Sequence, residues 1–133
     1  MSTVKTIKDD IFDSKCESIV CPVNCVGVLG AGLAKAFRDD EKFKGPNESY
    51  YQACKKGELG LGSVWLGVSD FEAKDCSYVF YLATKFHWKD YSNMNTIENS
   101  LINLEKAMNF YKIKSCAIPF IVVLLFESFN SFT

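Results

Sequence analysis

The sequence predicts an α/β domain of three layers, in which helices cover both faces of a mixed central sheet. Segments of strand-like and helical character alternate along the chain in the order β, β, α, α, β, β, α, β. Residues 19–37 are typical of a buried strand, a glycine loop and the start of a helix of small residues. No internal repeat or low-complexity linker divides the 133 residues, so we expect one compact domain.

The first half of the chain predicts two strands and two helices. Residues 4–8 alternate apolar and polar side chains, as a half-buried strand does, whereas residues 18–23 are continuously apolar, as a central strand is. A short helix is expected at residues 32–38. The second helix lies between Pro46 and Gly57, because proline fits a first helical turn and glycine commonly follows a last one.

The second half predicts two strands, a long helix and a final strand. Residues 63–68 and 78–84 are rich in β-forming residues and are separated by a charged surface turn. The stretch at residues 95–98 resembles a capping box, and apolar residues follow it at helical spacing as far as Tyr111. A last strand is expected at residues 116–121.

The charge and the cysteine content limit the possible functions. A formal net charge of −1 argues against a wide basic face for nucleic acid, so a small ligand fits better. The six cysteines include no C-x-x-C pair and there is a single histidine, so we expect no metal and no cofactor. The start of the chain has no apolar signal segment, and residues 116–126 are too short to span a bilayer. We therefore expect a cytoplasmic protein with free thiols and no membrane partner.

The glycine loop at residues 24–32 is the first candidate site. Successive backbone N–H groups in such a loop, together with the positive end of the following helix, can hold a diphosphate without a basic side chain. The glycine spacing matches neither the P-loop nor the Rossmann fingerprint. The alternative is a tight strand-to-helix turn in which the glycines only relieve steric crowding.

The polar and aromatic cluster at residues 84–89 is the second candidate. It follows an apolar strand, and ligands of open α/β sheets bind at such strand ends. Lys85 can act there as a nucleophile toward an aldehyde-like carbon or as an electrostatic clamp; the alternative is an ordinary solvated lysine. His87 belongs to no cysteine or serine motif, which favours a capping or packing role for it.

Asp10 is the third candidate, because it follows the first predicted strand. A carboxylate at a strand end can accept a hydrogen bond from an exocyclic amine such as that of adenine. The alternative is a solvated turn.

Taken together, the three segments resemble the macrodomain family of ADP-ribose-binding modules. Residues 22–34 are most similar to the subgroup that contains the DNA ADP-ribosyl glycohydrolase antitoxins of DarG type and the terminal ADP-ribose glycohydrolase. Residues 81–89 are similar to the Thr-Lys-x-His-Trp-Arg stretch of that subgroup. The resemblance implies a three-layer α/β/α macrodomain.

The resemblance also implies a role for each matched position. Asp10 would bind the adenine amine, with the backbone of Ile11 beside it, and Asn24 would hold the distal ribose. The diphosphate would be bound by the backbone amides of Gly30, Ala31 and Gly32.

Lys85 would be the catalytic residue, with Thr84 orienting it. In this subgroup the lysine is proposed to attack the anomeric carbon of the distal ribose and release the modified base or carboxylate, after which an acid helps to resolve an open-chain adduct. Aromatic side chains nearby can stack an exposed base, which favours a substrate linked to nucleic acid, and core or rim packing is the alternative. These side chains are Phe86, Trp88 and Tyr91.

The carboxy-terminal residues depart from the family pattern. After Pro119 the family continues with a second glycine-rich loop over the diphosphate and distal ribose, whereas residues 120–133 contain no glycine. We therefore divide the chain into a macrodomain at residues 1–120, with its last strand and helix incomplete, and an atypical apolar tail at residues 121–133. The loop would supply roughly half of the phosphate cage, so its loss would lower affinity and turnover. A shifted reading frame or an early stop would account for the tail.

The sequence thus predicts an ADP-ribose-binding macrodomain that removes ADP-ribose from modified DNA or protein through Lys85. Three alternatives stay open: a module that binds ADP-ribose without cleaving it, an ADP-ribose-1″-phosphate phosphatase, and an inactive remnant. The expected partner is ADP-ribose or an ADP-ribosylated substrate, and the sequence does not decide whether a toxin is a further partner.

Overall fold

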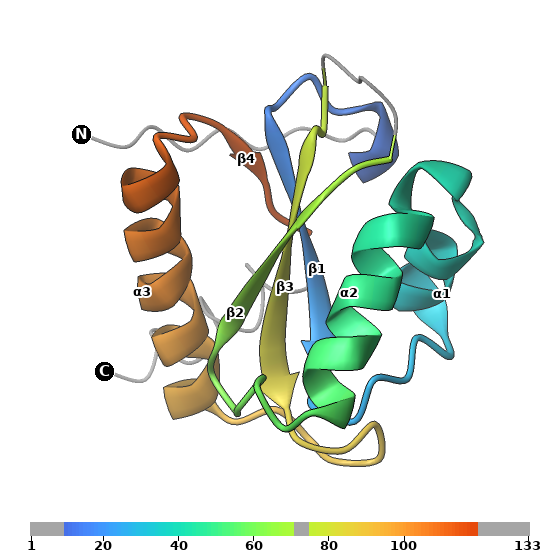
Figure 1. Cartoon of the computed structure of the whole chain (residues 1–133). Coiled ribbons are helices and arrows are strands. Elements are labelled where there is room, and N and C mark those ends of the chain that lie inside the picture. Colours follow the sequence, from blue (N-terminus) through green and yellow to red (C-terminus); the bar gives the residue numbers. More distant parts are fainter. Residues whose placement is uncertain (1–9, 71–74, 120–133) are drawn as a thin grey trace.

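The structure, a computed structural model, describes residues 10–70 and 75–119. In these residues one mixed sheet has the strand order β2-β3-β1-β4 (Figure 1). Its strands are β1 (Ser18–Asn24), β2 (Val64–Val68), β3 (Tyr78–Lys85) and β4 (Cys116–Ala117). β1 is parallel to both β3 and β4, whereas β2 is antiparallel to β3. The strand predicted at residues 4–8 and the apolar tail lie outside the described residues.

Helices cover both faces of the sheet, as the sequence predicts. On one face lie α1 (Gly32–Asp39) and α2 (Lys44–Lys55), and on the other lies α3 (Met94–Tyr111) (Figure 1). Two short 3₁₀ helices, η1 (Ile11–Asp13) and η2 (Glu41–Phe43), complete the described elements. Among the residues that the structure describes, no helix is both long enough and apolar enough to cross a membrane.

β1 and β3 are buried on both faces, which explains why their sequences are almost continuously apolar. Odd-numbered side chains of both strands, such as Ile19 and Tyr81, pack in a cluster with Phe37 of α1 and Tyr50 of α2. Even-numbered side chains, Val20, Phe80 and Leu82, pack with Leu104 of α3. The strict alternation fixes which layer each position of β3 faces.

The predicted start of the long helix is wrong by a few residues. α3 begins at Met94, and its N-cap is Asn93 rather than a residue of the stretch at 95–98. Asn93 has extended backbone dihedral angles, and its Oδ1 accepts the N–H of Thr96 at 2.9 Å. The helix ends at Tyr111, and the C-cap residue Lys112 takes the left-handed conformation with a φ of 57°.

The carboxyl ends of β1 and β3 meet at one edge of the sheet, because the two strands run parallel (lower edge in Figure 1). The loop that follows β1 and the turn that follows β3 therefore lie side by side. This edge carries the two main candidate segments.

Candidate functional site

The side chain of Asn24 organises the loop that follows β1. Its Oδ1 accepts the backbone N–H groups of Val26, Gly27 and Val28 at 3.1, 3.0 and 3.2 Å, and its Nδ2 donates to the backbone oxygen of Val28 at 2.9 Å. The amide thus supplies hydrogen bonds that an irregular loop cannot make with its own backbone. The predicted contact of Asn24 with the distal ribose stays a prediction, and in the structure its amide shapes the loop.

Helix α2 anchors the same loop. The hydroxyl of the fully buried Tyr50 donates to the backbone oxygen of Asn24 at 2.7 Å. Gly27 has a φ of 87°, and a Cβ atom at this position would lie 2.9 Å from Cδ1 of Tyr51. Both the dihedral angle and the close approach of α2 therefore require glycine. Sequence reasoning missed Tyr50, because its place on the apolar side of a helix signals only a core position.

The loop ends at the N-terminus of α1. No side chain of the described residues caps this helix, whose N-cap is Ala31, and its first turn contains no acidic residue. Gly30, Ala31 and Gly32 are all exposed. The N–H groups of a first helical turn have no partner within the helix and carry partial positive charge. This end of α1 can therefore bind an anion through its backbone.

Lys85 ends β3, directly beside this loop. The pairing of β1 with β3 shifts register at its end, so that Asn24 lies opposite Lys85 and Thr84 is the extra residue. Such an irregularity redirects the neighbouring side chains and is common next to active sites. Beyond the shift, the N–H of Cys25 donates to the backbone oxygen of Phe86 at 2.8 Å, which keeps the loop joined to the strand end.

The turn at residues 87–90 holds the amine of Lys85. Nζ of Lys85 donates to the backbone oxygen of Trp88 at 3.2 Å. Asp90 closes the turn, because its Oδ2 accepts the N–H of His87 at 2.9 Å and its own N–H donates to the backbone oxygen of His87 at 2.9 Å. Nδ1 of His87 accepts the N–H of Lys89 at 3.2 Å, so this histidine has the capping role that the sequence favours.

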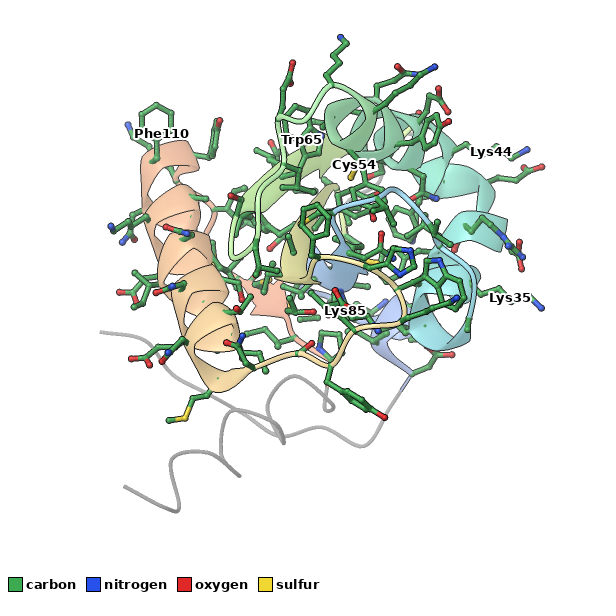
Figure 2. All side chains as sticks on the ribbon, turned by 90° about the horizontal axis from the view of Figure 1, so that it is seen from below. Lys35, Lys44, Cys54, Trp65, Lys85 and Phe110 are labelled. Atoms are coloured by element: carbon green, nitrogen blue, oxygen red, sulfur yellow. The ribbon has the colours of Figure 1, made fainter. Side chains whose placement is uncertain are left out.

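These segments surround a cleft of about 550 Å³ at the lower edge of the sheet. Five predicted site residues line it: Asn24, Gly30, Ala31, Thr84 and Lys85. Gly32 follows directly as the first residue of α1 and is not part of the lining. Seen from below, Lys85 lies between α3 and α1 (Figure 2). The volume is in the range of small-ligand sites.

Asp10 and Ile11 lie outside this lining. Asp10 is exposed and caps η1, where its Oδ1 accepts the N–H of Phe12 at 3.0 Å. Ile11 is half-buried against the core. The short helix η1 lies near the amino-terminal end of β1, at the opposite edge of the sheet from the cleft (Figure 1). The structure thus does not bring this pair to the cleft, and its role in adenine binding stays a prediction.

The thiols near the loop are poor nucleophiles. Burial raises the pKa of Cys25 and Cys54, the neighbouring Cys54 raises that of Cys25 further, and burial also raises the pKa of Cys21. Because the thiolate is the reactive form, the raised pKa values lower the reactivity of these thiols at neutral pH. All six cysteines are free, as the sequence predicts. Lys85 carries the one amine side chain in the described lining of the cleft, and its role as a nucleophile stays a prediction.

Comparison with known proteins finds relatives over most of the chain. The DNA ADP-ribosyl glycohydrolase of Mycobacterium tuberculosis is 31% identical over 110 residues, which are 83% of this chain and 30% of that protein. The DNA ADP-ribosyl glycohydrolase of Thermus aquaticus is 28% identical over 116 residues, 87% of this chain and 31% of that protein. This chain therefore spans less than a third of the length of these relatives. No family model matches the sequence.

Solved structures share the fold. The macrodomain of Mycobacterium tuberculosis DarG is 28% identical with a TM-score of 0.80, and the match covers 90% of this chain and 76% of that one. Thermosipho africanus DarTG in complex with ADP-ribose is 30% identical with a TM-score of 0.74, over 83% of this chain and 31% of that one. Fold and sequence agree with the resemblance carried by residues 22–34 and 81–89. The chain belongs to the macrodomain family and is a macrodomain of the DarG type.

Proposed function

We propose that this macrodomain binds ADP-ribose in the cleft and removes it from ADP-ribosylated DNA. The observation that carries the proposal is that Lys85 lines the same cleft as the Asn24 loop, so that a nucleophilic amine lies beside a backbone cradle for a diphosphate. The relatives support the chemistry, because they are named DNA ADP-ribosyl glycohydrolases and one related structure is an ADP-ribose complex.

The diphosphate binds to backbone N–H groups in this proposal. Gly30, Ala31 and Gly32 offer them at the uncapped start of α1, where the helix dipole also favours a negative charge. The hydrogen bonds of Asn24 and Tyr50 fix the loop before the ligand arrives. A site that is ordered in advance loses less entropy on binding, which increases affinity.

Lys85 performs the chemical step in this proposal. Its Nζ attacks C1″ of the distal ribose, and a bond from Nζ to C1″ forms as the bond from C1″ to the DNA base breaks. The base leaves with the bonding electron pair and takes up the proton that the attacking nitrogen loses. Water then hydrolyses the ribosyl-lysine adduct, which restores the amine and releases ADP-ribose. The hydrogen bond from Nζ to Trp88 positions the amine at the cleft before the substrate binds.

A pair of lysine variants tests the proposal. Lys85→Ala should abolish hydrolysis of a single-stranded oligonucleotide that carries ADP-ribose, and it should still bind free ADP-ribose in calorimetry. Lys35→Ala is the matched control, because Lys35 is exposed on α1 and points away from the cleft (Figure 2). Hydrolysis retained by Lys85→Ala would overturn the lysine mechanism, and absence of any binding of ADP-ribose to the wild type would overturn the whole proposal.

The same assays separate the alternatives. A module that binds ADP-ribose without cleaving it gives a heat of binding in calorimetry but no hydrolysis product. A phosphatase releases phosphate from ADP-ribose-1″-phosphate and leaves the modified oligonucleotide intact. Hydrolysis of a glutamate-linked ADP-ribosyl peptide in preference to the oligonucleotide would assign the substrate to protein rather than to DNA.

A further inference from the structure

A second hollow, of about 410 Å³, adjoins the ADP-ribose cleft at Lys85. Thr84 and Lys85 line both spaces, and no other described residue does. The remaining lining of the second hollow comes from the loop before β2, the turn after β3 and the first turn of α3. The reactive amine thus stands between two separate spaces. The chemistry proposed for the cleft accounts for only one of them.

Three of the eight residues that line the second hollow have large apolar or aromatic side chains, and all three are exposed. Leu61 is 49% exposed, Phe86 is 58% exposed and Tyr91 is 96% exposed. Phe86 and Tyr91 thus present aromatic rings to solvent beside Lys85, where a ligand can reach them. Aromatic rings of this kind stack on nucleobases, because every base offers a flat π-face.

Two polar side chains of the hollow, those of Asp90 and Asn93, are held by hydrogen bonds to the backbone. Oδ1 of Asn93 accepts the N–H of Thr96 at 2.9 Å, which leaves the Nδ2 group as a donor for a ligand. Oδ2 of Asp90 accepts the N–H of His87 at 2.9 Å, which leaves Oδ1 as an acceptor. The edges of nucleobases carry both donors and acceptors, so they match this pair.

We propose that the second hollow holds the nucleobase from which ADP-ribose is removed, in single-stranded DNA. The inference rests on the proposed function. Since C1″ must lie within reach of Nζ of Lys85, the base bonded to C1″ must also lie beside that lysine, in space that ADP-ribose does not fill. A base in a single strand can leave its neighbours and stack on Tyr91, whereas a paired base in a duplex has its faces covered.

The charge of the chain fits this mode of binding. A formal net charge of −1 argues against a wide basic face for the DNA backbone, so we expect stacking to supply most of the affinity for the DNA part. The contribution of the DNA to binding should therefore depend only weakly on salt.

The test uses Lys85→Ala, in which the substrate is not turned over. We expect an oligonucleotide with one ADP-ribosylated base to bind about tenfold tighter than free ADP-ribose, from the stacking of one base. Adding Tyr91→Ala should remove that gain and leave the affinity for ADP-ribose unchanged, whereas adding Tyr91→Phe should keep the gain.

Phe110→Ala is the control, because Phe110 is an aromatic residue, 78% exposed, near the other end of α3. Tyr91 is almost fully exposed, so its replacement has little packing to disturb.

Each outcome bears on one of the two proposals. If ADP-ribose binds but the modified oligonucleotide binds no tighter, or if Tyr91→Ala keeps the gain, the second hollow is not a base site and the proposed function still stands. If the wild type does not bind free ADP-ribose at all, the proposed function fails and this inference fails with it. If a glutamate-linked ADP-ribosyl peptide shows the same gain and the same loss with Tyr91→Ala, the assignment to a nucleobase is wrong.

Discussion

The hydroxyl of Tyr50 donates a hydrogen bond of 2.7 Å to the backbone oxygen of Asn24, and neither residue is more than 4% exposed. Asn24 is the last residue of β1, at the point where the pairing with β3 becomes irregular. A buried backbone oxygen needs a donor, and here a side chain of α2 supplies it. One helix therefore fixes the place where β1 passes into the proposed diphosphate loop.

Replacing Tyr50 by phenylalanine should destabilise the fold by about 1–2 kcal/mol, because it leaves the buried oxygen of Asn24 with only the weak thiol donor of Cys54 at 3.9 Å. Affinity for ADP-ribose should fall severalfold, since the loop loses its anchor. Urea unfolding and calorimetry measure the two effects. Tyr51→Phe removes the hydroxyl of the adjacent residue, which is 43% exposed, and should change neither quantity. Equal stability of the two variants would contradict the anchoring role.

Gly27→Ala should both destabilise the protein and weaken the binding of ADP-ribose. The new methyl group would meet the ring of Tyr51 at 2.9 Å, in addition to the cost of about 1–2 kcal/mol for a left-handed conformation. Gly57→Ala is the matched control, because Gly57 has a φ of 72° but a methyl group added there would meet no atom within 4 Å. Gly57→Ala should lose stability only through the cost of the left-handed conformation, and its affinity for ADP-ribose should stay unchanged. Thermal unfolding measures the stability of both variants, and calorimetry measures their affinity for ADP-ribose. Equal stability and equal affinity of the two variants would refute the steric explanation.

The cap of α3 can be located by two asparagine variants. Asn93→Ala should lower the free energy of unfolding by about 1 kcal/mol, because Oδ1 of Asn93 satisfies the N–H of Thr96. Asn95→Ala lies inside the first turn and should have little effect. Urea titration followed by circular dichroism measures both. A larger loss for Asn95→Ala would show that the helix begins where the sequence alone suggested.

Stability should fall as the pH rises above about 9. A thiol has an ordinary pKa of 9.0, whereas burial raises the pKa of Cys21 and raises that of Cys116 to about 12. The unfolded chain therefore releases these protons at a lower pH than the folded chain does. The resulting stabilisation is complete below pH 9 and is lost progressively above it. Urea unfolding at pH 7.5, 9 and 10 measures the decline.

The control for this pH dependence is Cys21→Ala. It should be less stable at every pH, because it leaves a small cavity in the core, but its stability should decline less between pH 8.5 and 10. Tyr50 and Tyr81 also have raised pKa values through burial, and they add to the decline above their ordinary value of 10.0. If stability declines identically in the wild type and in Cys21→Ala, the thiol of Cys21 is not the cause of the decline.

Periodicity predicted most of the fold. The sequences of the buried strands β1 and β3 are apolar runs, because these strands are buried on both faces. The sequences of the helices are amphipathic, because each helix buries one face. The sequence places the N-cap of α3 at the wrong asparagine. Asn93 and Asn95 are the same residue type, so the sequence alone does not decide between them, whereas in the structure Asn93 has the extended backbone of an N-cap. The predicted end of this helix is confirmed, because the apolar spacing runs as far as Tyr111, which is the last residue of α3.

The candidate site was predictable in part. Lys85 and the Asn24 loop were expected together, because parallel strands bring their carboxyl ends to one edge. Tyr50 could not be recognised, since a buried tyrosine on a helix looks like ordinary core. The second hollow was not recognised either, because Leu61 comes from a distant loop that carries no motif. Asp10 was expected near the ligand, and its position depends on how η1 packs rather than on its own residue type.

The register shift at the end of β3 makes the position of Lys85 depend on the length of this strand as well as on its composition. Thr84 is the extra residue, and Lys85 lies opposite Asn24 directly beyond it. Side chains along a strand alternate between its two faces, so inserting one residue after Thr84 would carry the lysine past Asn24 and reverse the face from which its side chain leaves. The core residues before the insertion would keep their places. A one-residue change in chain length at this point would therefore leave the core intact and still displace the amine from the cleft.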